Sequence, residues 1–288
     1  MALSAAEFEY VRTLLREHSA LSMDEDKQYL VESRLEPLAQ EEGFPSLQSL
    51  ILRLKSEPST SSLHRKVVDA MTTNETSFFR DVRPFRLLEQ LALPQLVTRR
   101  ASERSLNIWC AASSSGQEPY SVAMLLRESF PTLVSWRIRL IASDISDAML
   151  CRCRIGRYSQ LEVDRGLPAA MRVKYFRKVG TEWEIDEEVR RMVEFHRINL
   201  IDSWPGLPSL DLIMMRNVLI YFEVERKKEI LEKARSLLRA DGYLLLGGAE
   251  TTLNIDDFFE PIQFAQTSCY QLRKTGAQTL TTASLASL

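Results

Sequence analysis

Between about residue 105 and residue 250, short apolar runs alternate with amphipathic stretches, and this alternation restricts the possible folds more than any other feature of the chain. The apolar runs are LNIWCAA, WRIRLIASD, VEFHRINL, DLIMMRNVLIYF and YLLLGGAE. Helices are expected from Glu118 to about Phe130, from about Ala148, and from Glu223 to Leu238. Such alternation is typical of βαβ units, so we expect an α/β fold with a parallel sheet covered by helices on both faces.

The segments around this region have other patterns. Residues 1 to about 90 repeat apolar side chains at helical spacing, with Ser46 as an expected N-cap. Residues 155–192 interrupt the alternation, and KYFRKVGTEWEID within them predicts a hairpin that turns at Gly180. DFFEPIQFA and TSCYQLRK predict a final antiparallel pair of strands, and Asp241 with Gly242 predicts a turn before the last apolar run.

We therefore divide the chain into three parts. Residues 1–90 are expected to form an all-helical N-terminal domain and linker, residues 91–274 the α/β domain with its 155–192 insertion, and residues 275–288 a disordered tail.

Composition excludes several classes of function. The chain has 288 residues with a net charge of −2, which argues against a general nucleic-acid binder. Its four cysteines lack CxxC spacing, so we expect free thiols in a reducing compartment and no metal site, although Cys151 and Cys153 leave a metal pair as an alternative. The N-terminus lacks the pattern of a signal peptide and no run of 18 apolar residues occurs, so we expect a cytoplasmic protein without membrane insertion.

Small or polar residues follow four of the apolar runs, at Ala112 to Glu118, Ser143-Asp144, Asn199-Leu200 and Arg216-Asn217. Ligands of open parallel sheets bind beyond the carboxyl ends of the strands, so these four loops predict a binding site. The first loop has neither the Gly-Lys-Ser/Thr of a phosphate-binding loop nor a GxGxxG pattern, which argues against a nucleotide phosphate or a dinucleotide.

The acidic residues of these loops suggest what binds there. Glu118 favours a ligand with a positive charge, or else it complements the dipole of the helix that it begins. Asp144 is placed to accept hydrogen bonds from a ribose diol, or else it caps the next helix. Both ligand readings together fit S-adenosylmethionine, which carries a ribose and a sulfonium.

Several motifs resemble the CheR family, the protein-glutamate methyltransferases of chemotaxis receptors. The strongest are MTTNETSFFRD (71–81), IWCAASSSGQEPYSVAMLL (108–126) and MRNVLIYF (215–222), while ASDIS (142–146), IGRYS (155–159) and INL (198–200) are similar to further family segments in the same order. The resemblance covers about residues 8 to 274. It implies a Rossmann-like S-adenosylmethionine-dependent methyltransferase domain with a small β-subdomain insertion, preceded by an all-α N-terminal domain.

The resemblance also implies the site residues and the reaction. Contacts to S-adenosylmethionine, and to its product S-adenosylhomocysteine, are implied for Asn74, Thr76, Arg80, Glu118, Asp144, Asn199, Leu200, Arg216 and Asn217. Arg80 and Tyr221 are the implied catalytic residues, and the implied substrates are glutamates in the cytoplasmic helical region of chemoreceptors. From the residues alone, Asn74 is also compatible with the start of a capped helix, and Tyr221 with a core aromatic.

Two departures from the family concern the partner. Residues 24–42 hold seven acidic and two basic residues, where family members often present a basic helix to the receptor. The hairpin at Gly180 is short, and the acidic residues Glu182, Glu184, Asp186, Glu187 and Glu188 beside it predict an acidic edge that repels acidic receptor-tail peptides. We therefore expect an enzyme that does not depend on a receptor's C-terminal pentapeptide. We also expect a monomer. The alternatives are a methyltransferase for another substrate and a non-catalytic module that binds S-adenosylmethionine.

Overall fold

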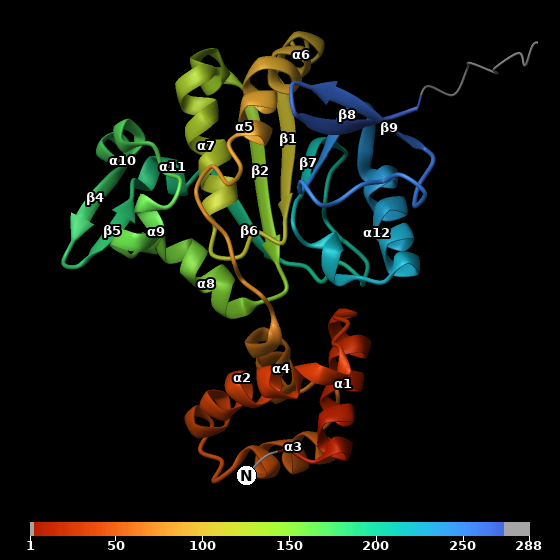
Figure 1. Cartoon of the computed structure of the whole chain (residues 1–288). Coiled ribbons are helices and arrows are strands. Elements are labelled where there is room, and N and C mark those ends of the chain that lie inside the picture. Colours follow the sequence, from red (N-terminus) through yellow and green to blue (C-terminus); the bar gives the residue numbers. More distant parts are fainter. Residues whose placement is uncertain (1–2, 274–288) are drawn as a thin grey trace, which may run out of the picture.

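The structure is a computed structural model that describes residues 3–273, so the expected tail at 275–288 lies outside the described residues. Helices form a small N-terminal domain, and a larger α/β domain stands beside it (Figure 1). No helix in the described part of the chain is long and apolar enough to cross a membrane.

The N-terminal domain packs four α-helices around one core. Its elements are α1 (Ala5–Ser19), the short 3₁₀ helix η1 (Glu25–Lys27), α2 (Gln28–Glu41), α3 (Leu47–Ser56) and α4 (Ser62–Met71). The side chains at helical spacing meet in the interior, where Val11, Leu35 and Leu50 are completely buried. The expected N-cap at Ser46 is confirmed, because its hydroxyl accepts a hydrogen bond from the backbone N–H of Ser49 at 3.2 Å.

Residues 72–82 connect the two domains as an irregular segment, so the alternative of a helix starting at Asn74 is wrong. Phe78 and Phe79 are both buried in the core of the α/β domain, and Phe79 has a positive φ of 47°. A right-handed helix needs a negative φ at every residue, and Phe79, Asp81 and Val82 all have positive φ, so this segment is not helical. The chain then continues through α5 (Arg83–Leu87), the π-helical turn η2 (Leu88–Ala92) and α6 (Leu93–Arg99).

A seven-stranded sheet forms the centre of the α/β domain, in the order β6-β2-β1-β7-β8-β10-β9. The strands are β1 (Ser105–Ala111), β2 (Arg137–Asp144), β6 (Val193–Arg197), β7 (Leu210–Met215), β8 (Leu238–Leu246), β9 (Phe259–Phe264) and β10 (Thr267–Leu272). The first five are parallel, and β10 runs antiparallel to β8 and β9. This confirms the predicted parallel sheet and the final antiparallel pair.

Helices cover the sheet on both sides (Figure 1). They are α7 (Gln117–Ser129), α8 (Asp147–Ile155) and α12 (Val224–Leu237), with the short 3₁₀ helices η3 (Pro131–Ser135) and η4 (Leu219–Tyr221). The expected turn at Asp241 and Gly242 is wrong: both lie inside β8, where the pairing with β7 shifts register. The irregularity that Asp-Gly signals is thus a bulge within a strand.

The insertion forms a subdomain with its own three-stranded sheet, in the order β3-β5-β4. It comprises β3 (Arg157–Tyr158), α9 (Gln160–Asp164), α10 (Ala169–Tyr175), β4 (Phe176–Val179), β5 (Glu182–Ile185) and α11 (Glu187–Arg190). The predicted hairpin is confirmed, since β4 and β5 pair antiparallel and Gly180 between them has a positive φ of 61°.

The expectation of an acidic edge on this hairpin is wrong. Glu184 lies on β5, the central strand, and its carboxylate pairs with Arg157 at 3.0 Å and Arg177 at 2.7 Å. The edge strand β4 carries Arg177 and Lys178 instead. The sequence does not reveal that β5 is the central strand, so it does not show that Glu184 lies inside this sheet and the basic residues of β4 at its edge.

Candidate active site

All ten predicted site residues line one cavity at the carboxyl ends of the parallel strands. The cavity holds about 880 Å³ of atom-free space, its open mouth included. The predicted residues in its wall are Asn74, Thr76, Arg80, Glu118, Asp144, Asn199, Leu200, Arg216, Asn217 and Tyr221. It lies where strand order reverses between β1 and β7, as expected for an open α/β sheet.

Three separate parts of the chain build this wall. The loops after the strands contribute most of it, the connecting segment contributes Thr72 to Thr76 and Arg80, and the N-terminal domain contributes Ser19 together with Leu21 just beyond α1. A ligand in the cavity therefore contacts both domains at once.

The tight turn after β1 lines the cavity on one side and packs against α8 and β3 on the other. Ala112 and Ser114 line the cavity and have positive φ values of 53° and 49°. Gly116, with φ of 95°, faces away from it: a Cβ there would stand 3.0 Å from Cys153 Sγ and 3.2 Å from the Tyr158 hydroxyl. The glycine is needed for packing against α8 and β3, while the alanine and the serine leave room for the ligand.

Asp144 stands at the end of β2 with both carboxylate oxygens engaged by backbone. Its Oδ2 accepts from Ser114 N at 2.8 Å and its Oδ1 from Ser146 N at 2.9 Å. Burial raises the pKa of Asp144, and these N–H groups oppose the rise. The N-cap of α8 is Ser146, whose hydroxyl accepts from Met149 N, so the alternative that Asp144 caps this helix is wrong. Each carboxylate oxygen keeps one lone-pair direction for a ligand hydroxyl.

Glu118 is paired inside the protein. Its Oε2 accepts from Arg216 Nη1 at 2.7 Å, and both side chains are almost wholly removed from solvent. Burial raises the pKa of the Glu118 carboxyl, and the guanidinium of Arg216 partly offsets this. The pair uses Oε2, Glu118 remains part of the cavity wall, and the pair partner 98 residues away was not visible from the sequence.

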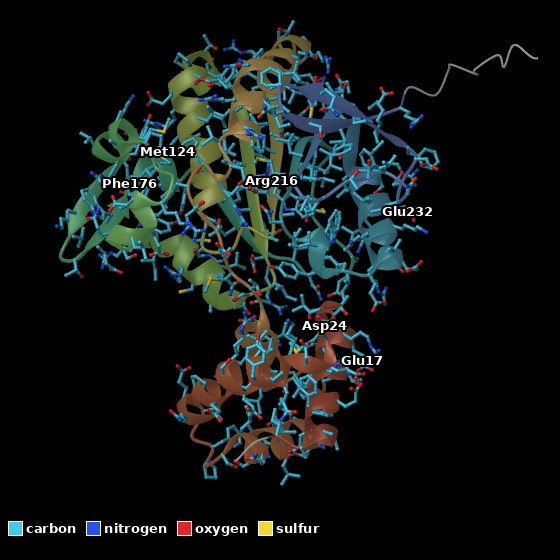
Figure 2. The ribbon with its side chains drawn as sticks, in the orientation of Figure 1. Glu17, Asp24, Met124, Phe176, Arg216 and Glu232 are labelled. Carbon is cyan, nitrogen blue, oxygen red and sulfur yellow. The ribbon has the colours of Figure 1, made fainter. Side chains whose placement is uncertain are left out.

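Arg216 joins the loop after β7 to Glu118 and to the connecting segment, and Figure 2 places it in the interior of the α/β domain. Besides Glu118, its Nη2 donates to Asp81 Oδ2 at 2.8 Å and to the backbone oxygen of Arg80 at 3.0 Å. Its Nε is buried and has no hydrogen-bond partner among the described residues. A buried donor without a partner in the wall of a cavity is suited to an acceptor on a ligand, such as a carboxylate.

The connecting segment is held against the first loop. Ser114 Oγ donates to the backbone oxygen of Asn74 at 2.8 Å, and Arg80 Nη1 donates to the backbone oxygen of Glu75 at 2.9 Å. These bonds fix the side chains of Asn74, Thr76 and Arg80 at one side of the cavity.

The loop after β6 joins the cavity to the N-terminal domain. Asn199 Nδ2 donates to the backbone oxygen of His18 at 2.8 Å, and the backbone oxygen of Leu200 accepts from Lys233 Nζ at 2.6 Å. The Asn199 side chain therefore contributes to domain docking as well as to the cavity wall.

Sequence reasoning missed two acidic residues that organise the site, Asp81 and Glu250. Asp81 ends the motif TNETSFFRD, and only the structure shows its pairing with Arg216. Glu250 ends the run YLLLGGAE, where an acid after an apolar strand and two glycines was the available signal. Its carboxylate receives the backbone N–H groups of the loop that carries Asn217 and Tyr221.

The geometry of the cavity fits S-adenosylmethionine. The carboxylate of Asp144 suits the ribose hydroxyls, Arg216 Nε suits a ligand carboxylate, and the apolar side chains of Ile145 and Ile198 offer surfaces to a base.

Comparisons with known proteins match most of the chain. The family model for the CheR methyltransferase all-alpha domain covers residues 6–72, and the model for the CheR methyltransferase SAM binding domain covers residues 74–267. The chemotaxis protein methyltransferase Cher2 of Pseudomonas putida is 38% identical over 277 residues, which are 95% of this chain and 100% of the relative. Chemotaxis protein methyltransferase 1 of Pseudomonas aeruginosa is 38% identical with the same coverage. The chemotaxis protein methyltransferase of Vibrio parahaemolyticus is 39% identical over 95% of this chain and 99% of its own length.

Proposed function

The chain belongs to the CheR methyltransferase family, and on that premise we propose that it esterifies glutamate side chains in the cytoplasmic helical region of a chemoreceptor. Membership makes it a chemotaxis methyltransferase that uses S-adenosylmethionine. The observation that carries the proposal is the single cavity that collects Arg80, Tyr221 and Asp144 from distant parts of the chain.

We assign the cofactor contacts by chemistry. Asp144 accepts from the ribose hydroxyls with its free lone pairs, and Arg216 Nε donates to the carboxylate of the methionine moiety. Asn74, Thr76, Asn199, Leu200 and Asn217 complete the wall, some through backbone groups. Glu118 acts through Arg216, whose guanidinium it holds at 2.7 Å.

The acceptor needs little acid–base help. A glutamate with a reference pKa of about 4.3 is a carboxylate at neutral pH and is already nucleophilic. The cofactor, when bound, supplies a methyl group on a sulfonium, so an oxygen–carbon bond forms as the sulfur–carbon bond breaks. We assign Arg80 to hold the incoming carboxylate with its guanidinium and Tyr221 to orient it with its hydroxyl. Positioning of this kind is worth up to roughly 7–11 kcal/mol in well-oriented reactions.

For the partner, we propose recognition of the receptor's helical region without the receptor's C-terminal pentapeptide. The support is the short turn of the hairpin, since Val179 pairs directly with Glu182 and leaves Gly180 and Thr181 between the strands. Repulsion by acidic residues does not contribute, because β4 at the edge is basic. We further propose that the enzyme acts as a monomer in the cytoplasm and does not bind nucleic acid, in keeping with its net charge of −2.

Transfer of a tritiated methyl group from S-adenosylmethionine to a receptor-containing membrane fraction tests the proposal, with base-labile label as the mark of a methyl ester. Arg80→Ala and Tyr221→Phe are expected to lose transfer while they keep their thermal midpoint. Arg86→Ala is the matched control, because Arg86 is an exposed arginine of the neighbouring helix α5 outside the cavity wall. Base-stable label, or label in nucleic acid or in small molecules, would assign the enzyme another substrate.

A receptor without its C-terminal tail tests the proposed docking. We expect its methylation rate to equal that of the intact receptor, and calorimetric titration with the isolated pentapeptide to show no heat. Binding of the peptide at micromolar concentrations, or a rate that collapses when the tail is removed, would contradict tail independence.

A further inference from the structure

Glu250 binds a whole loop through one carboxylate. Its Oε2 accepts from Asn217 N at 2.7 Å and from Gly247 N at 2.6 Å. Its Oε1 accepts from Val218 N at 2.8 Å and from Ile220 N at 3.2 Å. Four backbone N–H groups from two loops therefore converge on a single side chain.

The 217–221 loop, which these hydrogen bonds hold, carries the cavity residues Asn217 and Tyr221. Both residues lie beyond the end of β7, so pairing within the sheet does not fix their positions. The loop starts after β7, and β7 and β8 end side by side with Met215 opposite Leu246. Asn217 has a positive φ of 57°, a left-handed conformation that asparagine adopts more readily than most other residues with a side chain. The loop then forms the single turn η4, which ends at Tyr221.

The neighbouring glycine shows how closely the two loops approach each other. A Cβ at Gly247 would stand 2.7 Å from Asn217 Nδ2, 2.8 Å from Asn217 N and 2.7 Å from Glu250 Oε2. Any side chain at this position would push the loop away from the carboxylate. Gly247 and Glu250 thus act together on the same contact.

We propose that Glu250 is a positioning residue for methyl transfer, which fixes the 217–221 loop so that Asn217 and Tyr221 face the reacting groups. The inference rests on the proposed function for the role of Tyr221. Glu250 is absent from the wall of the main cavity and lies in a second, adjoining one, and its oxygens are engaged by backbone. It acts through the loop and does not contact the cofactor in the main cavity.

Substitution by glutamine is the sharpest test, because the side chain keeps its size. An amide offers one oxygen as acceptor, and its NH₂ group would face two of the four N–H donors. Displacing reacting groups by about 1 Å costs on the order of 100-fold in rate. We therefore expect Glu250→Gln to lower kcat about 10- to 100-fold, while the KM for the receptor and the Kd for S-adenosylhomocysteine change no more than about fivefold.

Glu103→Gln is the matched control for the loss of a glutamate charge. Glu103 is exposed, pairs with Arg239 at 2.9 Å, and lies just before the amino end of β1, whereas the cavity lies at the carboxyl ends of the strands. It is expected to keep wild-type kcat. A kcat per folded Glu250→Gln molecule within about twofold of wild type, or an equal loss in Glu103→Gln, overturns the proposal.

Hydrogen exchange on the wild-type chain keeps the test decisive if Glu250→Gln does not fold. The amides of Val218 and Ile220 are expected to be protected, although they belong to no strand or α-helix, because the carboxylate accepts from both. Exchange at the rate of open loops overturns the proposal. Methyl transfer to the receptor by the wild-type enzyme is measured first. If the wild type does not methylate the receptor, the proposed function is wrong. If the wild type does and Glu250→Gln is as active, the role assigned to Glu250 is wrong.

Discussion

Replacing Arg216 with methionine removes the charge that compensates Glu118 and keeps the length of the side chain. Arg216 is 1% exposed at its side chain and Glu118 is 11% exposed, so the remaining carboxylate would stay buried without a counter-charge. The half-exposed Asp81 would return to water at little cost, since its side chain is 54% exposed.

Arg216→Met is expected to lower the free energy of unfolding strongly, because the buried carboxylate of Glu118 loses its ion-pair partner. Breaking a buried ion pair from one side destabilises a protein by about 3–5 kcal/mol. Glu118→Gln alone should cost less, about 1–2 kcal/mol, because the amide oxygen still accepts from Arg216. In the double variant no buried charge lacks a partner, so we expect it to be more stable than the sum of the single losses predicts by about 2–3 kcal/mol.

Tryptophan fluorescence reports on unfolding of the methyltransferase domain alone. All four tryptophans, Trp109, Trp136, Trp183 and Trp204, belong to the methyltransferase domain, so urea unfolding followed by their fluorescence measures that domain and not the helical one. Burial raises the pKa of Glu118, and loss of Arg216 raises it further. A raised pKa contributes stability at low pH that is lost as pH rises, so the penalty of Arg216→Met should be smaller at pH 5 than at pH 8.

Two outcomes would refute this reasoning. One is a loss below about 1 kcal/mol for Arg216→Met at pH 8, which would mean that water or another group compensates the carboxylate. The other is strict additivity of the double variant, which would mean that the two side chains do not depend on each other.

Three further predictions concern the cofactor, the pH response and the packing of the insertion. Asp144→Ala should weaken S-adenosylhomocysteine binding about 10- to 100-fold in calorimetry, since the ribose loses charged acceptors, and an unchanged Kd would assign Asp144 to structure alone. Burial raises the pKa of Asp69 to about 6 in the folded chain, against about 3.8 for an exposed carboxyl. The protonated Asp69 therefore favours the folded state below pH 3.8, and this stabilisation is lost as the pH rises through 6. Asp69→Asn should therefore stabilise the chain by on the order of 1–2 kcal/mol at pH 7.5 and by less at pH 5, and thermal midpoints with equal shifts at both pH values would contradict this. Gly166→Ala places a Cβ 2.1 Å from the backbone oxygen of Phe78 and should lower the free energy of unfolding in urea by more than about 3 kcal/mol. Gly180→Ala is the control, because its Cβ meets open space and only its positive φ is strained, at a cost of about 1–2 kcal/mol. Equal losses would show that the backbone near Gly166 moves to make room for the Cβ.

Much of the fold was predictable because it depends on local pattern. The alternation of apolar runs and helices predicted the parallel sheet, and the loops that follow the strands at 112–118, 143–144, 199–200 and 216–217 do meet in one cavity. The carboxyl ends of parallel strands lie at one edge of a sheet, so this convergence follows from topology.

The features that sequence reasoning missed depend on contacts between distant residues. The pairing of Glu118 with Arg216 joins positions 98 residues apart, so the sequence did not indicate that Glu118 has a counter-charge. Glu250 and Asn217 meet across two loops in the same way. The irregular course of residues 72–82 was not evident because polar residues beside two phenylalanines are also typical of a capped helix start.

The connecting segment has one more consequence, since it both links the two domains and forms part of the cavity wall. Ser19 and Leu21 belong to the helical domain and Asp144 to the sheet, and residues 72–76 pass between them in the same wall. A cofactor that contacts both domains would couple its affinity to domain docking, and each would then strengthen the other by the same free energy. A partner that binds only the helical domain would in that case change the affinity of the cavity for its ligand without contacting it. A methyltransferase domain separated from the helical domain would lack Ser19 and Leu21 in its cavity wall.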